Sequence, residues 1–168
     1  MITGKNYVGS TLKAAGNKTF KTFNPQQNVE NPWVFTEATH EEIEEAVALA
    51  HQAFGTYKKC SGLERAGFLN AIADEIVALG NDLLVQYCSE SGFPMGRAEG
   101  ERGRMVGQLR AFAQMLIEGS WVQAAIDTAI TDRVPAPKED LRKILVPLGP
   151  VVVFGSSNFP FAFSTAGG

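Results

Sequence analysis

This chain of 168 residues has no excess of positive charge, no long apolar run and only two cysteines. Fifteen Lys and Arg against eighteen Asp and Glu give a formal net charge of −3, so no basic field attracts a nucleic-acid backbone. The longest apolar runs fall far short of the ~20 residues that a helix needs to span a bilayer. We therefore expect neither nucleic acid nor a membrane among its partners.

The chain holds two cysteines and two histidines, so few side chains are available for redox chemistry or metal binding. Cys60 and Cys88 cannot build a disulfide framework, and His40 and His51 have no Cys or Asp at ligand spacing. We predict no metal site and a reducing, cytoplasmic location, because the N-terminus also lacks a signal-peptide core. Cys60 follows two lysines and is interpreted as a turn residue or a reactive thiol, and Cys88 as a core residue.

The N-terminal 36 residues alternate short apolar stretches with turn residues. Asn24-Pro25 and Asn31-Pro32 are both typical of turns. This pattern predicts short strands or extended segments joined by turns.

A helical period follows, introduced by two capping boxes, Thr39 to Glu42 and Ser61 to Glu64. Apolar spacings of three and four behind them predict helices over residues 40–57 and from 62 to about 80, and a third helix that Asn81 caps. The face of the first helix expected to be buried consists of Ile43, Ala46, Val47, Ala50, Phe54 and Tyr57.

A fourth, longer helix is predicted from about Gly96 to Glu118. Its glycines Gly96, Gly100, Gly103 and Gly107 are four, three and four residues apart and so share one face. Each glycine costs about 0.5–1 kcal/mol relative to alanine in a helix, which is understandable if another helix approaches closely there. The alternative is an irregular loop as far as Met105.

Two further segments follow the helices. Val134-Pro135 interrupts a mixed stretch, and Leu141 to Val146 is typical of a strand, so a hairpin arm is expected. The continuous run Val151 to Phe154 is typical of a parallel strand that is buried on both faces.

The residues after this run are the best candidates for chemistry, because neither common glycine-rich phosphate motif occurs anywhere in the chain. Ligands bind beyond the carboxyl end of a buried parallel strand, which here is Phe154 to Asn158. The Asn158 amide has two N–H donors that can stabilise negative charge developing on a carbonyl oxygen. Alternatively, Asn158 only caps the next helix, which is the interpretation that the residues alone favour.

The segment Val151 to Gly168, with strand, short loop, Asn-Phe-Pro and helix, resembles the signature of the aldehyde dehydrogenase superfamily. The resemblance implies that Asn158 donates to a thiohemiacetal oxyanion, together with the backbone N–H of a cysteine nucleophile. The residues implied to lie along the nicotinamide cofactor are Phe154, Gly155, Ser156 and Ser157. Those implied to face the substrate passage are Phe159 and Phe163.

Weaker similarities to this family extend over essentially the whole chain. Glu64 to Leu84 looks like its second helix, Asn24-Pro25 its early turn, and Ser89 to Glu101 its Glu-x-Gly-x-Pro segment. The implied fold class is α/β, the N-terminal part of the aldehyde dehydrogenase fold. It comprises a helical lead-in, the start of a Rossmann-like parallel sheet and an oligomerisation hairpin.

The resemblance divides the chain into three parts. Residues 1–119 hold extended segments and helices of the cofactor-binding domain, and residues 120–147 the oligomerisation arm. Residues 148–168 hold the first strand and the active-site loop of a truncated Rossmann-like domain. A homo-oligomer, either dimer or tetramer, is expected.

The expected function is oxidation of an aldehyde to a carboxylate with NADP or NAD. Phe154 to Gly168 is most similar to the subgroup that acts on α-ketoglutarate semialdehyde. Many family members have a Lys where this chain has Gly167. The family's nucleophilic Cys, general-base Glu and ribose-binding Lys come after residue 168, and neither Cys60 nor Cys88 lies in the nucleophile's context. The chain alone is therefore expected to be inactive.

Two other functions compete with this expectation. One is a stand-alone helical interaction module, in which Val151 to Phe154 pairs with a partner protein. The other is a nucleotide-binding fragment, which is disfavoured because the helix on the phosphate side is missing.

Overall fold

Short strands and turns fill residues 2–36 of the computed structural model, which describes residues 2–165. This part of the sequence prediction is confirmed. Two antiparallel hairpins are present, and they pair β1 (Asn6–Val8) with β2 (Thr11–Lys13) and β3 (Thr19–Asn24) with β4 (Val29–Thr36).

Asn31-Pro32 lies inside β4, so the prediction of a turn there is wrong. Proline has no N–H to give to a strand ladder, but the pairing is irregular opposite it, between Lys21 and Phe23 of β3. The buried Asn31 donates from Nδ2 to Thr22 Oγ1 at 3.1 Å. The irregularity therefore lets β4 continue through the proline.

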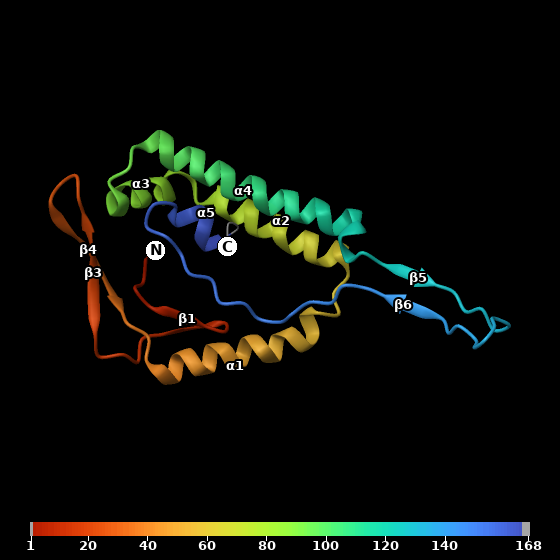
Figure 1. The fold of residues 1–168 in the computed structure, drawn as a ribbon. Helices are drawn as coiled ribbons and strands as arrows, with labels where there is room; N and C mark the ends of the chain where they lie inside the picture. The colour runs from red at the N-terminus through yellow and green to blue at the C-terminus, as the bar shows by residue number, and fades with distance from the viewer. Residues whose placement is uncertain (1, 166–168) are drawn as a thin grey trace.

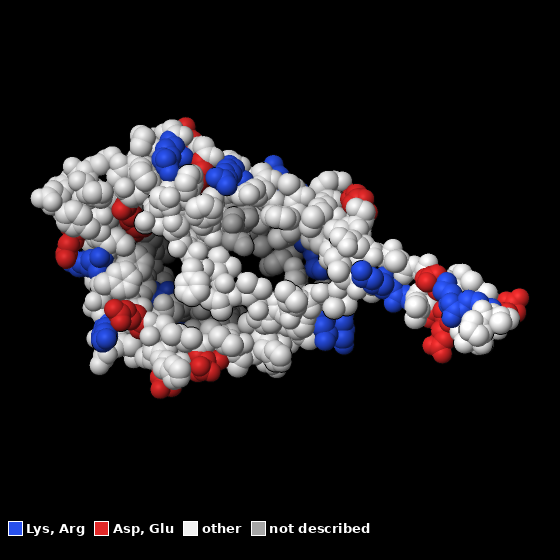
Figure 2. Space-filling model, in the orientation of Figure 1, with Lys and Arg blue, Asp and Glu red and all other residues white. Residues whose placement is uncertain are grey.

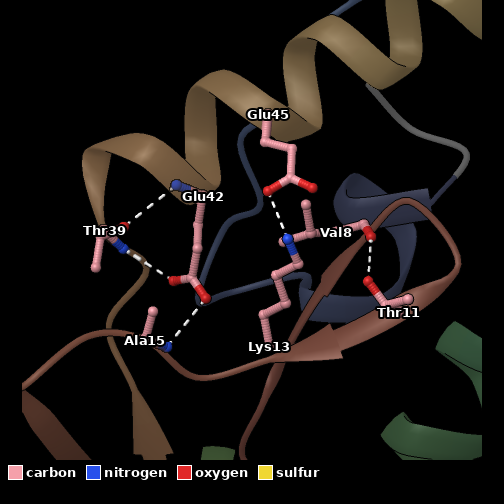
Figure 3. Close-up of polar contacts among 7 residues, drawn as sticks. All are labelled: Val8, Thr11, Lys13, Ala15, Thr39, Glu42 and Glu45. Carbon is pink, nitrogen blue, oxygen red and sulfur yellow. Dashed lines mark hydrogen bonds and ion pairs between the residues drawn. The ribbon is translucent and has the colours of Figure 1, made fainter.

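Helix α1 (His40–Tyr57) begins at the predicted capping box (Figure 3). Glu42 N donates to Thr39 Oγ1 at 3.2 Å, and Thr39 N donates to Glu42 Oε2 at 3.0 Å. The other carboxylate oxygen accepts from Ala15 N at 3.0 Å. Glu42 thus starts the helix and also attaches it to the segment that follows β2.

The apolar face predicted for α1 remains uncovered by residues 2–165. Ile43 and Val47 are 51% and 52% exposed, so the prediction that this face is buried is wrong for the described chain. Figure 1 shows the reason, since α1 lies along the lower edge, apart from the other long helices.

The main core lies between α2 (Gly62–Ala78) and α4 (Met95–Glu118), which run side by side (Figure 1). Ala73 of α2 packs with Met105 and Leu109 of α4, and all three are buried. The capping box predicted at Ser61 opens α2, which ends two residues before Gly80. Half-buried side chains that surround this core are Leu69, Ile72, Ile76, Val106 and Phe161.

Helix α3 (Gly80–Ser91) begins one residue before Asn81, so the prediction that Asn81 caps it is wrong. Leu79 ends α2 and also precedes α3, without a side-chain cap. The left-handed φ of 60° at Gly80 makes the bend between the two helices, which leaves no gap for a capping residue. A second core cluster joins α3 to α4 through Leu84, Tyr87 and Ala98.

The glycine-bearing face of α4 is open. The helix is continuous from Met95, so the alternative of an irregular loop is wrong. A methyl group added at Gly96, Gly100, Gly103 or Gly107 would meet no atom within 4 Å among the described residues. The predicted close helix partner is therefore not found within residues 2–165, because α2 packs on the opposite set of α4 side chains.

A hairpin projects from the helical body after the short helix η1 (Ser120–Val122), as Figure 1 shows. Strands β5 (Ala125–Asp127) and β6 (Leu141–Lys143) pair antiparallel, which confirms a hairpin at this place. The second strand is shorter than the predicted 141–146, since its pairing ends at Lys143.

The run Val151 to Phe154 is not a strand, and its residues are 48–87% exposed, so this prediction is wrong for the described chain. A parallel strand that is buried on both faces needs a neighbouring strand to pair with and helices over both faces, which residues 2–165 do not supply. The helix expected after the loop is present as α5 (Pro160–Thr165). Gly167 lies outside the described residues.

Candidate active-site loop

The loop Gly155 to Phe159 leads into α5 and is held by α4. Arg97 Nη2 donates to the backbone oxygen of Asn158 at 2.7 Å. The same guanidinium lies over two rings, 4.2 Å from the centroid of Phe93 and 4.8 Å from that of Phe159. Arg97 therefore fixes the backbone at the residue that carries the candidate amide.

Glu101 holds the beginning of α5 from within α4. One oxygen accepts from Phe161 N at 2.8 Å and Ala162 N at 3.1 Å, and the other accepts from Tyr87 Oη at 2.6 Å. The first N–H groups of a helix have no partner within it, and a carboxylate also favours that end of the helix dipole. Glu101 therefore caps α5, and the interpretation that Asn158 is the cap is wrong.

Tyr87 joins three helices at this point. Its ring lies 4.7 Å from that of Phe161, and its hydroxyl donates to Glu101. Burial raises the pKa of Tyr87, and the hydrogen bond to Glu101 raises it further. The phenol therefore stays protonated as the donor that links α3, α4 and α5.

The Asn158 side chain is exposed, and its orientation is set by a neighbour. Its Oδ1 accepts from the Ser156 hydroxyl. Within residues 2–165 no protein acceptor binds its Nδ2 group. The amide therefore has its oxygen held and its two N–H donors available to a ligand, which is the arrangement that an oxyanion site needs.

The residues predicted to contact the cofactor lie along the same loop. Ser156 is placed by Asn158, and a Cβ at Gly155 would come within 2.5 Å of Ser164 Oγ, so glycine lets the loop approach α5 closely. Phe154 is 87% exposed and Ser157 is also exposed. Both side chains are therefore exposed on the segment that precedes Asn158.

The residues predicted to contact the substrate pack against each other. The rings of Phe159 and Phe163 meet edge to face, with centroids 5.3 Å apart.

Two cavities of about 280 and 300 Å³ border the loop. The first is lined by Arg97, Gly100, Glu101, Arg104 and Phe159. Residues lining the second include Tyr87, Ser157, Pro160 and Phe161.

Neither cysteine lies on the candidate loop. Cys88 packs against the cluster of Leu84, Tyr87 and Ala98, as expected of a core residue. Cys60 is a free thiol in the turn before α2.

Residues 2–165 contain no group of three His, Cys, Asp or Glu side chains that could hold a metal ion. Within the same range, every helix is too short or too polar to cross a membrane.

Sequence reasoning assigned no role to Arg97 or Glu101, although both position the loop. A signal was available for Glu101, which falls three residues after Ala98 and four before Met105. A carboxylate on the buried face of a helix needs donors from elsewhere in the fold. The periodicity of α4 therefore marks Glu101, but it does not reveal the partners.

A family model and two curated relatives match the chain over nearly its whole length. A model described as "Aldehyde dehydrogenase family" matches residues 12–167. The chain is 47% identical to alpha-ketoglutaric semialdehyde dehydrogenase 2 of Azospirillum brasilense, and 42% identical to alpha-ketoglutaric semialdehyde dehydrogenase of Acinetobacter baylyi. The alignments cover 99% and 98% of this chain but 32% and 31% of the relatives, so the chain spans about a third of their length.

The solved structures lead to the same fold. A NAD-dependent benzaldehyde dehydrogenase from Corynebacterium glutamicum matches with a TM-score of 0.69 at 15% identity, over 79% of this chain and 28% of that chain. At this identity the likeness establishes the fold alone, and it confirms the α/β class expected from the sequence. Taken with the match over residues 12–167, these findings show that the chain belongs to the aldehyde dehydrogenase family.

Proposed function

We propose that these residues form the N-terminal third of an enzyme that oxidises an aldehyde to a carboxylate with NAD or NADP. Family membership supports the reaction class, and the names of the two relatives make α-ketoglutarate semialdehyde the first candidate substrate. The observation that carries the proposal is the Asn158 amide, whose oxygen is held by Ser156 while its N–H groups stay available.

Asn158 acts at the step in which charge develops on the aldehyde oxygen. When a cysteine thiolate attacks the aldehyde carbon, the carbonyl oxygen becomes an oxyanion, and Asn158 donates an N–H to it. The cysteine is expected beyond residue 168. Because Arg97 and Glu101 already fix the loop, the donor needs little reorganisation during the reaction.

The nicotinamide, when bound, accepts the hydride that leaves the substrate carbon. Phe154 and Ser157 would lie beside it, since both are exposed on the loop before Asn158, and Gly155 offers backbone without a side chain. The choice between NAD and NADP belongs to ribose-contacting residues expected outside this chain.

Replacing Asn158 tests this function in the full-length protein. Asn158→Ala should lower the rate of nicotinamide reduction by ~10²–10³-fold with little change in substrate affinity, because the donor matters most once the oxyanion forms. Asn81→Ala is the matched control, an exposed asparagine in the first turn of α3. Unchanged turnover in Asn158→Ala would contradict the assignment.

The β5–β6 hairpin completes the proposal as a contact between subunits of a homo-oligomer. Ile126 is 68% exposed and Leu141 is 59% exposed on this projecting element (Figure 1). Exposed apolar side chains on an arm support a partner surface. Sedimentation of Ile126→Asp should show smaller assemblies than the wild type and than Thr131→Asp on the same arm. Equal sizes for all three would exclude this role.

A further inference from the structure

A third cavity, of about 620 Å³, lies between the N-terminal segment, β4 and α3. It is lined by Ile2, by Trp33 of β4 and by residues of the span Leu79 to Gln86. None of these residues belongs to the loop Gly155 to Phe159. Figure 1 shows β4 and α3 at one end of the molecule, with the β5–β6 hairpin at the other. The cavity is therefore separate from the candidate active-site loop, and it is large enough for a small molecule.

The walls of this cavity are mainly apolar. Trp33 is half-buried, and no aromatic ring or cation within residues 2–165 stacks on it. Leu79 and Val85 are exposed, and Leu83 lies between them in sequence. Apolar side chains gathered around a hollow, with an aromatic ring among them, are typical of a ligand site. A molecule that fills this hollow needs an apolar body.

The one charged side chain that lines the cavity is an acid, Asp82. It is exposed in the first turn of α3 and forms no ion pair within residues 2–165. Gln86 donates to Glu90 Oε1 at 2.6 Å, so the other polar lining residue is held by a second carboxylate. Figure 2 shows acidic and basic side chains interspersed over the visible face, so local groups decide which charge is attracted here. Asp82 favours a cation.

We propose that this cavity binds a small amphipathic cation, an apolar molecule that carries one protonated amine. The ammonium group lies at Asp82, and the apolar body lies against Trp33, whose ring face also attracts cations. The aldehyde and nicotinamide of the proposed reaction are negatively charged, so the carboxylate that attracts an amine disfavours both of them here. Binding does not require the reaction and can be measured without aldehyde or nicotinamide.

Calorimetric titration of the full-length protein with phenethylamine, and with its neutral counterpart phenethyl alcohol, tests the site. The amine should bind about fivefold more tightly than the alcohol, the effect of one ionic contact at an exposed carboxylate. Asp82→Asn, which keeps the shape of an exposed side chain and so keeps the fold, should remove this difference. Asp82→Glu, which keeps the charge, should retain part of it. Trp33→Leu should weaken the binding of both probes, because the apolar body loses the ring.

Asp74→Asn is the matched control, since it removes an exposed carboxylate of α2 that pairs with Arg110. It should keep the wild-type difference between the two probes. Equal binding of amine and alcohol by the wild type, or an unchanged difference in Asp82→Asn, overturns the amine site. Unchanged binding of both probes in Trp33→Leu places them elsewhere on the protein and also overturns it, as does a wild type that binds neither.

Discussion

Two buried glutamates anchor two different regions of this molecule. Glu42 is 4% exposed, begins α1 and accepts from Thr39 N and Ala15 N. Glu101 is 5% exposed, lies within α4, and accepts from Tyr87 and from the first turn of α5. Each carboxylate accepts from backbone N–H groups that would otherwise lack an acceptor. Only Glu101 holds a loop with candidate chemistry.

The difference between them is the sequence distance of the donors. Thr39 is three residues from Glu42, so the capping box is visible in the sequence. Phe161 and Ala162 are 60 and 61 residues from Glu101, and only the packing of α4 against α5 brings them together. Glu42 therefore fixes the start of α1 and ties it to a segment 27 residues earlier, whereas Glu101 fixes the position of α5 against α4.

The largest effect is expected from Glu101→Ala, which leaves two backbone N–H groups and the Tyr87 hydroxyl without their acceptor. Unpaired buried groups of this kind cost about 1–3 kcal/mol each. Hydrogen exchange at Phe161 and Ala162 should become faster, and turnover of the full-length protein should fall at least tenfold because Asn158 loses its support. Glu99→Ala, at an exposed site on the same helix, should change neither. Unaltered exchange in Glu101→Ala would show that α5 does not depend on this carboxylate.

A smaller effect is expected from Glu42→Ala, which should loosen α1 from the segment at Ala15. A lost cap costs about 1–2 kcal/mol, and the contact to Ala15 adds to it. Exchange at the Ala15 amide should become faster while turnover is kept, because α1 lies apart from the loop. The exposed Glu44→Ala is the control. Loss of turnover in Glu42→Ala would erase the distinction between the two regions.

Tyr87→Phe should weaken the Glu101 region at neutral pH, and its difference in stability from the wild type should disappear at alkaline pH. The folded-state pKa of Tyr87 is raised above its ordinary value of 10.0, by burial and then by Glu101. Its contribution to stability is therefore complete below the unfolded pKa and is lost as the pH rises through the folded pKa. Thermal unfolding of the wild type should show this alkaline loss, and Tyr87→Phe should lack that component. Parallel pH profiles would argue against it.

The smallest effect is expected at the exposed cap of α2. Ser61 N donates to Glu64 at 2.7 Å, and this backbone contact, aided by the Ser61 hydroxyl, lowers the pKa of Glu64 below 4.5. Such a group stabilises the fold above its unfolded pKa and loses that effect as the pH falls through the folded pKa. Glu64→Gln should slightly flatten the acid side of the thermal stability profile. A steeper acid loss would contradict this sign.

The sequence predicted most of the elements whose determining contacts are local, although the turn at Asn31-Pro32 and the cap at Asn81 were wrong. Both capping boxes, the four long helices and the hairpin were predictable because caps, periodicity and turns act over a few residues. Three surfaces whose composition predicted burial are not buried in the described chain. The α1 face around Ile43, the glycine face of α4 and Val151 to Phe154 remain exposed among the described residues. Burial needs a second surface, and periodicity does not say where that surface lies.

The candidate site shows the same difference between local and remote contacts. Asn158 and its neighbours were identifiable from a continuous motif, whereas the arginine and glutamate that hold them come from a helix 60 residues earlier. The periodicity of α4 could have marked Glu101 as a residue of the buried face, but it does not name its partners. The loop motif is therefore readable from sequence, and its support becomes visible only in the fold.

The most direct test of the account is a double-mutant cycle on the rate of nicotinamide reduction in a single turnover. Asn158→Ala, Glu101→Ala and the double variant are compared with the wild type in the full-length protein. If Glu101 acts by positioning Asn158, the double variant loses no more rate than Asn158→Ala alone. Losses that multiply would show that the two residues act independently, and would contradict the claim that α4 sets the geometry of the candidate active-site loop.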